Sequence, residues 1–540
     1  MDVLKTYIAA DTVVDSLATR LRRETGGRVE GEIAPYNQIQ QTLLGPAKAP
    51  LLLLWSSPDL QLRNFERVLS GEAVDLSAVM AEVDAFANLL RSAAGHYERI
   101  FHLTWTLPPD RGVAVGLSGL AGFGCADILA RANIRLADQV ADVGNIQIID
   151  LSHLQAMFDG AMFDPRLNVL GRMRFAPDFV AFVARRLAPV LEATVRASRK
   201  LIVCDLDNTL WGGIIGDDGL EGIRIGNNNP VGEAHLKIQR ELKSLKNRGI
   251  LLAISSKNSE EIALDAIDNH PTMLLRREDF VARRINWDDK AANIISMLDE
   301  LKLLPNSVVF LDDNPVERQR VRDAIPDILV PELPKDVAYW SGLIADLGCF
   351  ETLGISAEDL KRTESYVTEA KRVSDQSLHA SLGEWLKSLA LKVTVQPLNT
   401  SNLKRSAQLV NKTNQFNLHT RRLGDAEFEA WCAEAGRECY TFSVADCYGD
   451  YGLTGVVTVE TRGGRRVVED FVMSCRVLGK AVEDAILAEV LSREPGLELE
   501  MVCIPTPKNA PIREFVDRIA PNGVVPPGLR CPDHIEMVRD

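Results

Sequence analysis

The stretch that decides the fold is Leu201-Ile-Val-Cys-Asp205-Leu-Asp207-Asn-Thr209-Leu-Trp-Gly-Gly213. A short apolar run, typical of a buried strand, ends in two aspartates two residues apart. Because side chains alternate along a strand, we expect Asp205 and Asp207 on the same side, at the strand end where open parallel α/β sheets place their ligands. Two neighbouring carboxylates stay ionised together only with a cation between them. Oxygen-only ligation favours Mg²⁺, and a carboxylate beside a metal-bound phosphoryl group is a candidate nucleophile.

Two later apolar runs end in polar residues in the same way. Gly249-Ile-Leu-Leu-Ala-Ile-Ser255-Ser256 predicts a second buried strand, and the hydroxyl of Ser256, or of Ser255 after a one-residue slip, is suited to donate to a phosphoryl oxygen. Ser307-Val-Val-Phe-Leu-Asp312-Asp313 predicts a third strand that ends in another carboxylate pair. Either member of this pair would complete a metal shell.

A lysine lies between these two strands in the sequence. The pattern that follows Ile285-Asn-Trp-Asp-Asp-Lys290 is amphipathic, so Lys290 is predicted at the start of a helix. Cations favour helix C-termini, and a lysine in this position therefore points to charge neutralisation at a reacting centre. Only 34 residues separate Ser256 from Lys290, which leaves no room for a large cap domain. An uncapped site admits bulky substrates, including substrates presented on another protein.

The ordered set of DxDxT, hydroxyl, lysine and DD resembles the haloacid dehalogenase (HAD) superfamily of phosphatases and phosphotransferases. The resemblance implies Asp205 as nucleophile and Asp207 as general acid/base, with the phosphoryl group held by Ser256 and Lys290. The Mg²⁺ ligands that it implies are Asp205, the Asp207 backbone carbonyl, and Asp312 or Asp313.

The composition excludes several classes of protein. The 540-residue chain is long enough for about three domains, and 46% hydrophobic with 25% charged residues is typical of a globular protein. A net charge of −14 argues against nucleic acid as a partner. The nine cysteines show no CxxC pair, the N-terminus shows no signal-peptide pattern, and no apolar run approaches about 18 residues. We therefore expect a cytoplasmic protein with reduced thiols and no membrane partner.

The sequence predicts an α/β chain of three segments, 1–195, 197–348 and 391–540, with a helical connector at 355–390. In the first segment, apolar runs at 50–56, 112–117 and 145–151 predict buried strands between helices. The third segment is predicted as α+β, with a strand at 391–396 and a hairpin of 455–460 and 466–474 that turns at Arg462-Gly-Gly.

A second motif lies in the third segment: Phe471-Val-Met-Ser-Cys475-Arg476-Val-Leu-Gly479-Lys-Ala481. It predicts a strand, a turn and then a helix whose free N-terminal amides suit a phosphate. The spacing of Arg476, Gly479 and Ala481 resembles the pyrophosphate loop of GCN5-related (GNAT) acyltransferases, which bind coenzyme A there. Cys475 lies just before the helix and beside Arg476, a setting that lowers a thiol pKa and favours a nucleophile.

Some polar residues allow two interpretations. The segment Asn411–His419 is dense in amides, which either orient a polyhydroxy acyl group or satisfy a buried loop. His419 and Asp446 are candidate general bases. The other cysteines, Cys204 included, are expected to be apolar core.

Six stretches together resemble one family, the FkbH-like proteins (HAD subfamily IIIC) of polyketide biosynthesis: DLDNTLWGGIIGDDG, SSKN, INWDDK, FLDDNPVER, LVNKTNQFNL and MSCRVLGKAVED. The resemblance implies a glyceryl transferase/phosphatase. Such an enzyme takes the glyceryl unit of 1,3-bisphosphoglycerate, a phosphorylated three-carbon acyl substrate, and removes phosphate. It loads the glyceryl thioester onto the phosphopantetheine arm of an acyl carrier protein, and coenzyme A is an alternative ligand for that phosphate site. The first segment resembles the SGNH-hydrolase-like domain of such proteins but lacks a GDS nucleophile block, so we expect it to be non-catalytic.

Two other hypotheses compete with this one. The chain is either a stand-alone HAD phosphatase for a small metabolite or phosphoprotein, or a carrier-protein docking module whose catalysis has lapsed. An acidic carrier would need a local basic patch, for which Arg276-Arg277, Arg283-Arg284 and Arg421-Arg422 are the candidates.

Overall fold

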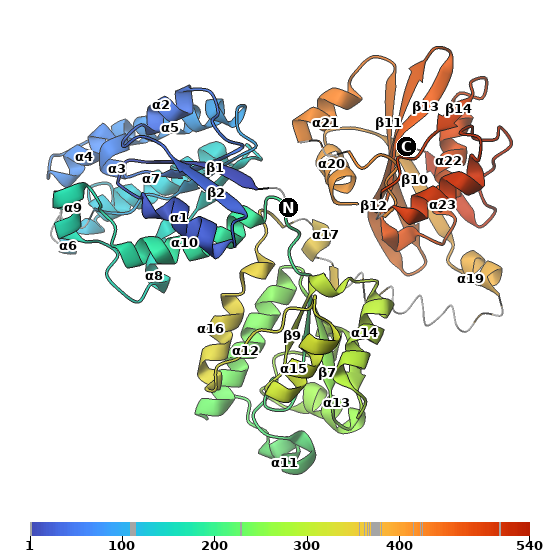
Figure 1. The fold of residues 1–540 in the computed structure, drawn as a ribbon, viewed down its shortest axis with the longest axis horizontal. Helices are drawn as coiled ribbons and strands as arrows, with labels where there is room; N and C mark the ends of the chain where they lie inside the picture. The colour runs from blue at the N-terminus through green and yellow to red at the C-terminus, as the bar shows by residue number, and fades with distance from the viewer. Residues whose placement is uncertain are drawn as a thin grey trace. The chain divides into compact units, whose positions relative to one another are not determined.

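The computed structural model describes residues 3–539 except 109–114, 227–228, 356, 361, 364–365, 367, 369–378, 380, 414, 422, 424 and 507–508. These residues form three β-sheets (Figure 1). The chain divides into two compact units: the first comprises Met1–Leu242, Trp287–Ile294 and Leu303–Ile355, and the second Lys243–Asn286, Ile295–Lys302 and Ser356–Asp540. Within the described ranges, no helix is both long and apolar enough to cross a membrane.

The first unit opens with a five-stranded parallel sheet of order β2-β1-β3-β4-β5. This strand order is one of the two common doubly wound α/β arrangements. The strands are β1 (Leu4–Ala10), β2 (Val29–Ile33), β3 (Leu51–Trp55), β4 (Arg99–Leu103) and β5 (Ile146–Ile149). The helices are α1 (Ser16–Glu24), α2 (Ile39–Leu44), α3 (Pro58–Gln61), α4 (Arg63–Leu69), α5 (Leu76–Ala94), α6 (Val115–Ser118), α7 (Cys125–Val140), α8 (Leu151–Met157), α9 (Pro165–Gly171) and α10 (Pro177–Glu192).

Helices cover both faces of this sheet, as Figure 1 shows for α5 and α10. Side chains alternate along β3, so Leu52 packs with Phe86 of α5 on one face. Leu53 packs with Phe179 of α10 on the other face. A strand that is buried on both faces has a continuous apolar sequence, and every residue of β3 is buried. The α/β character predicted from the apolar run at 50–56 is therefore confirmed.

One strand predicted in this segment is wrong where it can be checked. Residues 112–114 lie outside the described residues, and Val115–Ser118 forms helix α6. Val115 is 92% exposed, whereas a residue of the predicted buried strand would be covered. The reason is that β4 (Arg99–Leu103) already occupies the place between β3 and β5. The strand predicted at 145–151 is confirmed as β5, which gives way to α8 at Leu151.

The second sheet carries the aspartate motifs and has the order β8-β7-β6-β9. Within the first unit, β6 (Leu201–Cys204) pairs in parallel with β9 (Val308–Leu311), and within the second, β7 (Leu251–Ser256) pairs in parallel with β8 (Phe280–Ile285). Every residue of β6, β7 and β9 is buried, so the three strands predicted around the site motifs are confirmed. The helices and 3₁₀ turns are α11 (Ile215–Gly222), α12 (Pro230–Asn247), α13 (Glu260–Asn269), η1 (Arg277–Asp279), α14 (Lys290–Leu301), η2 (Pro305–Ser307), α15 (Pro315–Ala324), η3 (Val337–Tyr339), α16 (Trp340–Ala345) and η4 (Gly348–Phe350).

The third sheet, in the second unit, is mostly antiparallel with the order β14-β13-β12-β11-β10-β15. Its pairs β10–β15 and β13–β14 are parallel. The strands are β10 (Leu391–Pro397), β11 (Arg437–Asp446), β12 (Gly449–Arg462), β13 (Arg465–Met473), β14 (Leu499–Met501) and β15 (Ile535–Arg539). The helical elements are α17 (Ala357–Leu360), α19 (Leu382–Ser388), α20 (Leu403–Lys412), α21 (Asp425–Cys432), η5 (Cys475–Val477), α22 (Val482–Arg493) and α23 (Ala510–Ile519).

The predicted hairpin of this sheet is confirmed. Strands β12 and β13 pair from Gly455 opposite Met473 to Arg462 opposite Arg465. The turn between them passes through Gly463 and Gly464, both with positive φ. Glycine adopts this backbone conformation without strain, which explains why the Gly-Gly pair marks the turn.

Candidate active site

Strand pairing brings the two aspartate motifs together. In the parallel pair β6–β9, Cys204 lies opposite Leu311, so the residues that follow, Asp205 and Asp312, leave the sheet side by side. The Asp205 N–H donates to Leu311 O at 2.9 Å just beyond the strand end. One carboxylate oxygen each of Asp205, Asp312 and Asp313 lies within 4.8 Å of the others. The cluster therefore contains both members of the DD pair.

Helix α14 begins at Lys290, as predicted, and its ammonium reaches this cluster. Lys290 Nζ lies 2.5 Å from Asp312 Oδ2 and 3.1 Å from Asp205 Oδ1. Burial by itself lowers the pKa of an ammonium, but the two carboxylates raise the pKa of Lys290 overall. Lys290 is therefore a fixed cation between the two motifs.

One cation does not balance three carboxylates, two of them buried (Asp205 and Asp312) and one half-buried (Asp313). Burial first, and repulsion from Asp205 second, raise the pKa of Asp312 to about 7 although Lys290 opposes the shift. The same two causes raise the pKa of Asp313 to about 6. Asp205 Oδ1 is buried and, apart from its ion pair with Lys290, has no hydrogen-bond partner among the described residues. Carboxylate oxygens in this arrangement fit a divalent cation such as Mg²⁺, held by Asp205, Asp312 and Asp313.

The Asp207 carboxylate is held differently. Strand β6 ends at Cys204, so the alternation that put Asp205 and Asp207 on one side does not extend to Asp207. Asp207 Oδ1 instead accepts the indole N–H of Trp211 at 2.8 Å and the backbone N–H of Ile215 at 3.0 Å. The carboxylate cluster of the described residues does not include Asp207, which leaves its backbone carbonyl for the ligand role implied by the resemblance.

The threonine of the DxDxT pattern ties the ends of β6 and β9 together, a contact that the sequence did not reveal. Thr209 Oγ1 accepts the Asp313 N–H at 3.2 Å. Two side chains of α12 hold the same loop from behind: His235 Nδ1 donates to Thr209 O at 2.9 Å and Gln239 donates to Leu210 O at 2.8 Å. Thr209 could be identified from the motif, whereas the sequence around His235 and Gln239 has no pattern that predicts their contacts with this loop.

Ser255 and Ser256 end strand β7 in the second unit, and both are buried. The choice between them and their phosphoryl contact stay predictions. Between Ser256 and Lys290 the described chain forms α13, η1 and β8, and between Trp211 and Gly249 it forms α11 and α12. These short elements agree with the expectation that no large cap domain is inserted in either interval.

The second motif forms the predicted strand, turn and helix. Strand β13 leads into η5, and α22 follows with Ala481 as its N-cap. Gly479 has φ 78° and Ala481 has φ 58°, so the backbone is left-handed at both positions. The N-cap residue Ala481 makes no side-chain hydrogen bond to the first turn of α22, and helix N-terminal amides that lack such a cap suit an anion.

The charges around this turn are mixed. Arg476 Nε donates to Ser474 Oγ at 3.3 Å. The first turn of α22 carries Glu483, whose pKa is raised by burial, and Asp484, which pairs with Arg518. Acidic side chains there compete with an anionic ligand. The Cys475 side chain lies outside the described residues, so its nucleophilic role stays a prediction.

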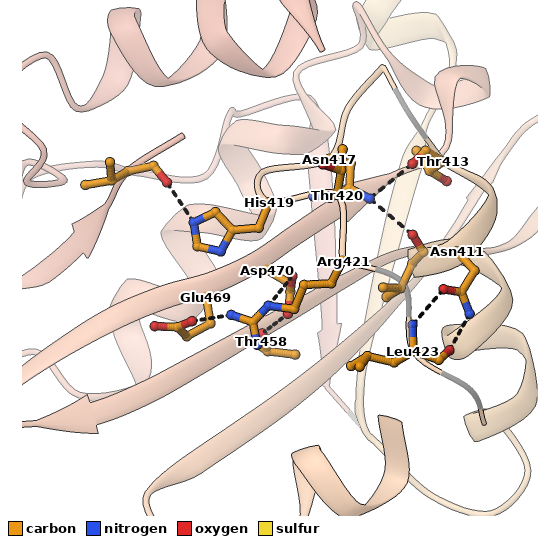
Figure 2. A network of polar contacts seen from close by, with 12 residues as sticks. Asn411, Thr413, Asn417, His419, Thr420, Arg421, Leu423, Thr458, Glu469 and Asp470 are labelled. Carbon is orange, nitrogen blue, oxygen red and sulfur yellow. Dashed lines mark hydrogen bonds and ion pairs between the residues drawn. The ribbon is translucent and has the colours of Figure 1, made fainter. Parts of the chain in front are cut away.

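Figure 2 shows how the amide-rich segment of the second unit is held. Asn411 donates to Leu423 O at 2.6 Å and accepts the Leu423 N–H at 3.0 Å. The fully buried Asn417 donates to Thr413 O at 3.0 Å and accepts the Thr420 N–H at 2.7 Å. Of the two interpretations open from the sequence, these contacts favour amides that satisfy their own loop.

The two candidate bases of the second unit, His419 and Asp446, also make hydrogen bonds within the chain. His419 Nε2 donates to Val502 O at 3.1 Å. Asp446 accepts two backbone N–H groups of its own turn and the Tyr451 hydroxyl at 2.7 Å. Asp446 therefore stabilises the β11–β12 turn, and no contact of the described residues assigns it a catalytic role.

Residues Phe416–Leu418 form a short link between β13 and the chain that follows β14. The Leu418 N–H donates to Phe471 O at 3.1 Å, and the Met473 N–H donates to Phe416 O at 3.0 Å. On the other side, the Ile504 N–H donates to Leu418 O at 3.1 Å. The link thus extends the sheet where β14 has already ended.

Comparisons with known proteins show a likeness to a solved phosphatase domain. No protein-family model and no curated protein matches the chain. The solved structure of the N-terminal part of the protein BF1531 from Bacteroides fragilis, which contains a phosphatase domain and is complexed with Mg, is 28% identical. The match covers 66% of this chain and 96% of that chain, with a TM-score of 0.58. The ribosomal-protein-S18-alanine N-acetyltransferase from Escherichia coli matches at 10% identity over 24% of this chain and 76% of its own, and its TM-score of 0.19 carries no inference.

The parallel sheet, the carboxylate cluster with its lysine and the likeness to BF1531 together support a HAD-like phosphatase domain in this chain. About a third of the chain lies outside that match. The SGNH-like character of the first segment, the GNAT-like character of the third and the FkbH-like assignment rest on sequence resemblance.

Proposed function

We propose that the chain is a Mg²⁺-dependent HAD-type phosphatase coupled to acyl transfer. It loads a glyceryl unit from 1,3-bisphosphoglycerate, as a thioester, onto an acyl carrier protein in polyketide biosynthesis. The phosphatase half is carried by one observation: Asp205, Asp312 and Asp313 lie together with Lys290 at the carboxyl ends of β6 and β9, in the order of the HAD motifs. The transferase half is supported by the sequence resemblance and by the β13–α22 turn.

In the phosphatase half, the Asp205 carboxylate attacks phosphorus while the bond from phosphorus to the ester oxygen breaks. Asp207 gives its proton to the departing alkoxide, then takes a proton from the water that attacks phosphorus and releases Asp205. The Lys290 ammonium stabilises negative charge at the reacting centre. A Mg²⁺ ion held by Asp205, Asp312 and Asp313 would neutralise phosphoryl charge.

In the transferase half, the acyl phosphate of the substrate is already activated. Attack by the Cys475 thiolate on the acyl carbon forms a thioester and expels inorganic phosphate, so no ATP is needed, and the sequence contains no GxxxxGK[ST] pattern. The thiol of the carrier's phosphopantetheine then takes the acyl group and returns the Cys475 thiolate. The N-terminus of α22, where Ala481 makes no side-chain cap and which follows Arg476 in the sequence, supports a place for the pantetheine phosphate.

Exposed apolar side chains around the site support a substrate presented on a protein. Ile214 is 46% exposed, Trp287 75% and Val316 70%. Each lies close to a motif in the sequence: Ile214 follows Thr209 by five residues, Trp287 precedes Lys290 by three, and Val316 follows Asp313 by three. Such apolar exposure beside an uncapped site is typical of a contact surface.

In each basic pair considered for docking, one arginine pairs with an acid of the chain itself. Arg277 pairs with Asp268, and Arg284 pairs with Glu300 at 2.7 Å. Arg421 pairs with Glu469, while Arg422 lies outside the described residues. The apolar side chains Ile214, Trp287 and Val316 are therefore favoured over these arginines as the carrier contact.

The test is intact mass spectrometry of a holo acyl carrier protein incubated with the chain, Mg²⁺ and 1,3-bisphosphoglycerate. A mass gain of one glyceryl thioester is expected. Phosphate release without any gain would favour a stand-alone phosphatase, and neither product would favour a lapsed docking module. Cys475→Ala should lose the mass gain, while hydrolysis of a simple phosphate ester continues. The exposed Cys447→Ala is the matched thiol control.

A further inference from the structure

The carboxylate of Asp207, the proposed acid–base residue, accepts two hydrogen bonds at one of its two oxygens. Trp211 Nε1 donates to Asp207 Oδ1 at 2.8 Å, and the Ile215 N–H donates to the same oxygen at 3.0 Å. Trp211 is fully buried, and Ile215 is 2% exposed. A carboxylate that receives two N–H donors on one oxygen has its plane fixed about χ2, which is otherwise a soft torsion.

The indole is a donor only, and a buried indole N–H needs a partner. In this loop its partner is an oxygen of Asp207, so the bond is charge-assisted, and stronger than a bond between neutral groups, whenever Asp207 is ionised. Because Trp211 lies four residues after Asp207 and is packed in the core, it acts as a rigid support. A flexible surface side chain would not hold the carboxylate in one orientation.

The turn that follows is built to deliver the second donor. Gly213 has φ 106°, and a Cβ at this position would lie 2.5 Å from Asp218 Oδ2. That same oxygen accepts the Ile214 N–H at 2.8 Å. The glycine therefore allows the chain to turn tightly enough for the next amide, that of Ile215, to reach Asp207.

We propose that Trp211 is the positioning residue of the acid–base step: its indole N–H, together with the Ile215 N–H, holds Asp207 Oδ1 and directs Oδ2 toward the phosphate ester. The inference rests on the phosphatase half of the proposed function. In the first half-reaction the bond from Asp205 to phosphorus forms, the ester P–O bond breaks, and the proton of Asp207 Oδ2 moves to the ester oxygen. In the second, water attacks phosphorus, its proton moves to Oδ2, and Asp205 leaves as a carboxylate.

The test is Trp211→Phe, which keeps an aromatic ring and removes the N–H. Single-turnover rates are measured in Mg²⁺ with p-nitrophenyl phosphate, whose phenolate leaves without a proton, and with 3-phosphoglycerate, whose alkoxide needs one. Since general acid–base catalysis contributes about 10²–10⁴-fold, alcohol release from 3-phosphoglycerate should fall about 100-fold. The first release of p-nitrophenol should stay within about threefold and be followed by slow turnover, and KM should change less than about threefold, because only proton transfer is impaired.

Trp340→Phe is the matched control, since Trp340 is also buried and donates its indole N–H to Pro334 O at 2.7 Å. It should leave both rates unchanged. If Trp211→Phe does not fold, the isosteric analogue benzothienylalanine at position 211, with sulfur in place of N–H, carries the same expectation.

Equal loss on the two substrates, or no loss on either, would overturn the positioning role. If the wild-type chain hydrolyses both esters, such a result for Trp211→Phe overturns this inference alone. A wild-type chain that hydrolyses neither ester overturns the phosphatase half and the inference with it.

Discussion

Lys290 Nζ, at the first residue of helix α14, lies 2.5 Å from Asp312 Oδ2 at the end of strand β9. The helix dipole disfavours a cation at this end of a helix. The lysine is buried as well, so its charge depends on the carboxylates beside it. The same carboxylates depend on Lys290, and this mutual dependence leads to the first two predictions.

Lys290→Met removes the cation and leaves a side chain of similar length. Breaking a buried ion pair in this way costs about 3–5 kcal/mol, because the remaining charges stay buried without compensation. We expect a loss of that size in urea unfolding with EDTA, and a smaller loss in Mg²⁺. The exposed Lys335→Met is the control and should stay within about 0.5 kcal/mol. Equal losses in EDTA and Mg²⁺ would contradict the electrostatic explanation.

Mg²⁺ should stabilise the chain more at pH 8 than at pH 5. The pKa of Asp312 is about 7 in the fold, above its ordinary value of 3.8, because burial and then Asp205 disfavour its charge. The folded chain therefore holds a proton that the unfolded chain releases, and metal-free stability falls as pH rises from about 4 to about 7. A bound cation replaces that proton. At 100 times its Kd, Mg²⁺ adds about 2.7 kcal/mol. Urea unfolding in EDTA and in Mg²⁺ at both pH values measures the effect, and an equal gain at both would refute it.

Asp205→Asn should reduce phosphate release below detection, because an amide does not form the aspartyl-phosphate. Stability in EDTA should stay equal or rise, since one of three crowded carboxylates loses its charge. Phosphate assays and urea unfolding check the two parts, with the exposed Asp217→Asn as control. If acyl capture is a separate step, a phosphoglyceryl adduct accumulates on Cys475 in this variant. Its absence on peptide mapping would discard the assignment of Cys475.

Trp287→Ala tests the carrier contact. Trp287 is 75% exposed and lies three residues before Lys290. Truncating an aromatic contact residue commonly costs 1–2 kcal/mol, so kcat/KM for a carrier-borne substrate should fall about tenfold. Hydrolysis of p-nitrophenyl phosphate should not change. Tyr339→Ala, another exposed aromatic of the first unit, should alter neither activity. A matching drop on the small substrate would mean that Trp287 serves the chemistry directly.

Asn417→Ala separates the two interpretations of the amide-rich segment (Figure 2). The change leaves buried backbone groups without partners, at about 1–3 kcal/mol for each such group. We expect a lower free energy of unfolding for the second unit and unchanged phosphate release. Gln415→Ala, an exposed amide nearby, should be neutral. Full stability combined with lost acyl loading would instead identify Asn417 as a substrate contact.

The site could be predicted from sequence as far as its geometry is local. An apolar run followed by acids gave β6 and β9, and parallel pairing then required Asp205 and Asp312 to meet. Helical periodicity placed Lys290 at the start of α14. These features depend on residues within one turn or one strand of each other, which is the range over which sequence patterns are informative.

Other features depend on contacts that no local pattern carries. The bond from Trp211 to Asp207 is set by a turn through Gly213, and the run at 112–117 has the composition of a strand although β4 takes its place in the sheet. Asn417 is bound from far along the chain, because Asn509 donates to Asn417 O at 3.2 Å. The density of amides at Asn411–His419 indicated that these side chains form hydrogen bonds, but it did not indicate their partners.

The link Phe416–Leu418 has a consequence for any shortened form of this protein. It receives a hydrogen bond from the Ile504 N–H, so a chain cut after β14 would leave Leu418 with an exposed backbone acceptor beside the end of β13. Bare strand edges recruit other chains. The residues after Met501 therefore protect this edge of the third sheet, and a chain truncated there is expected to self-associate even if its individual strands form.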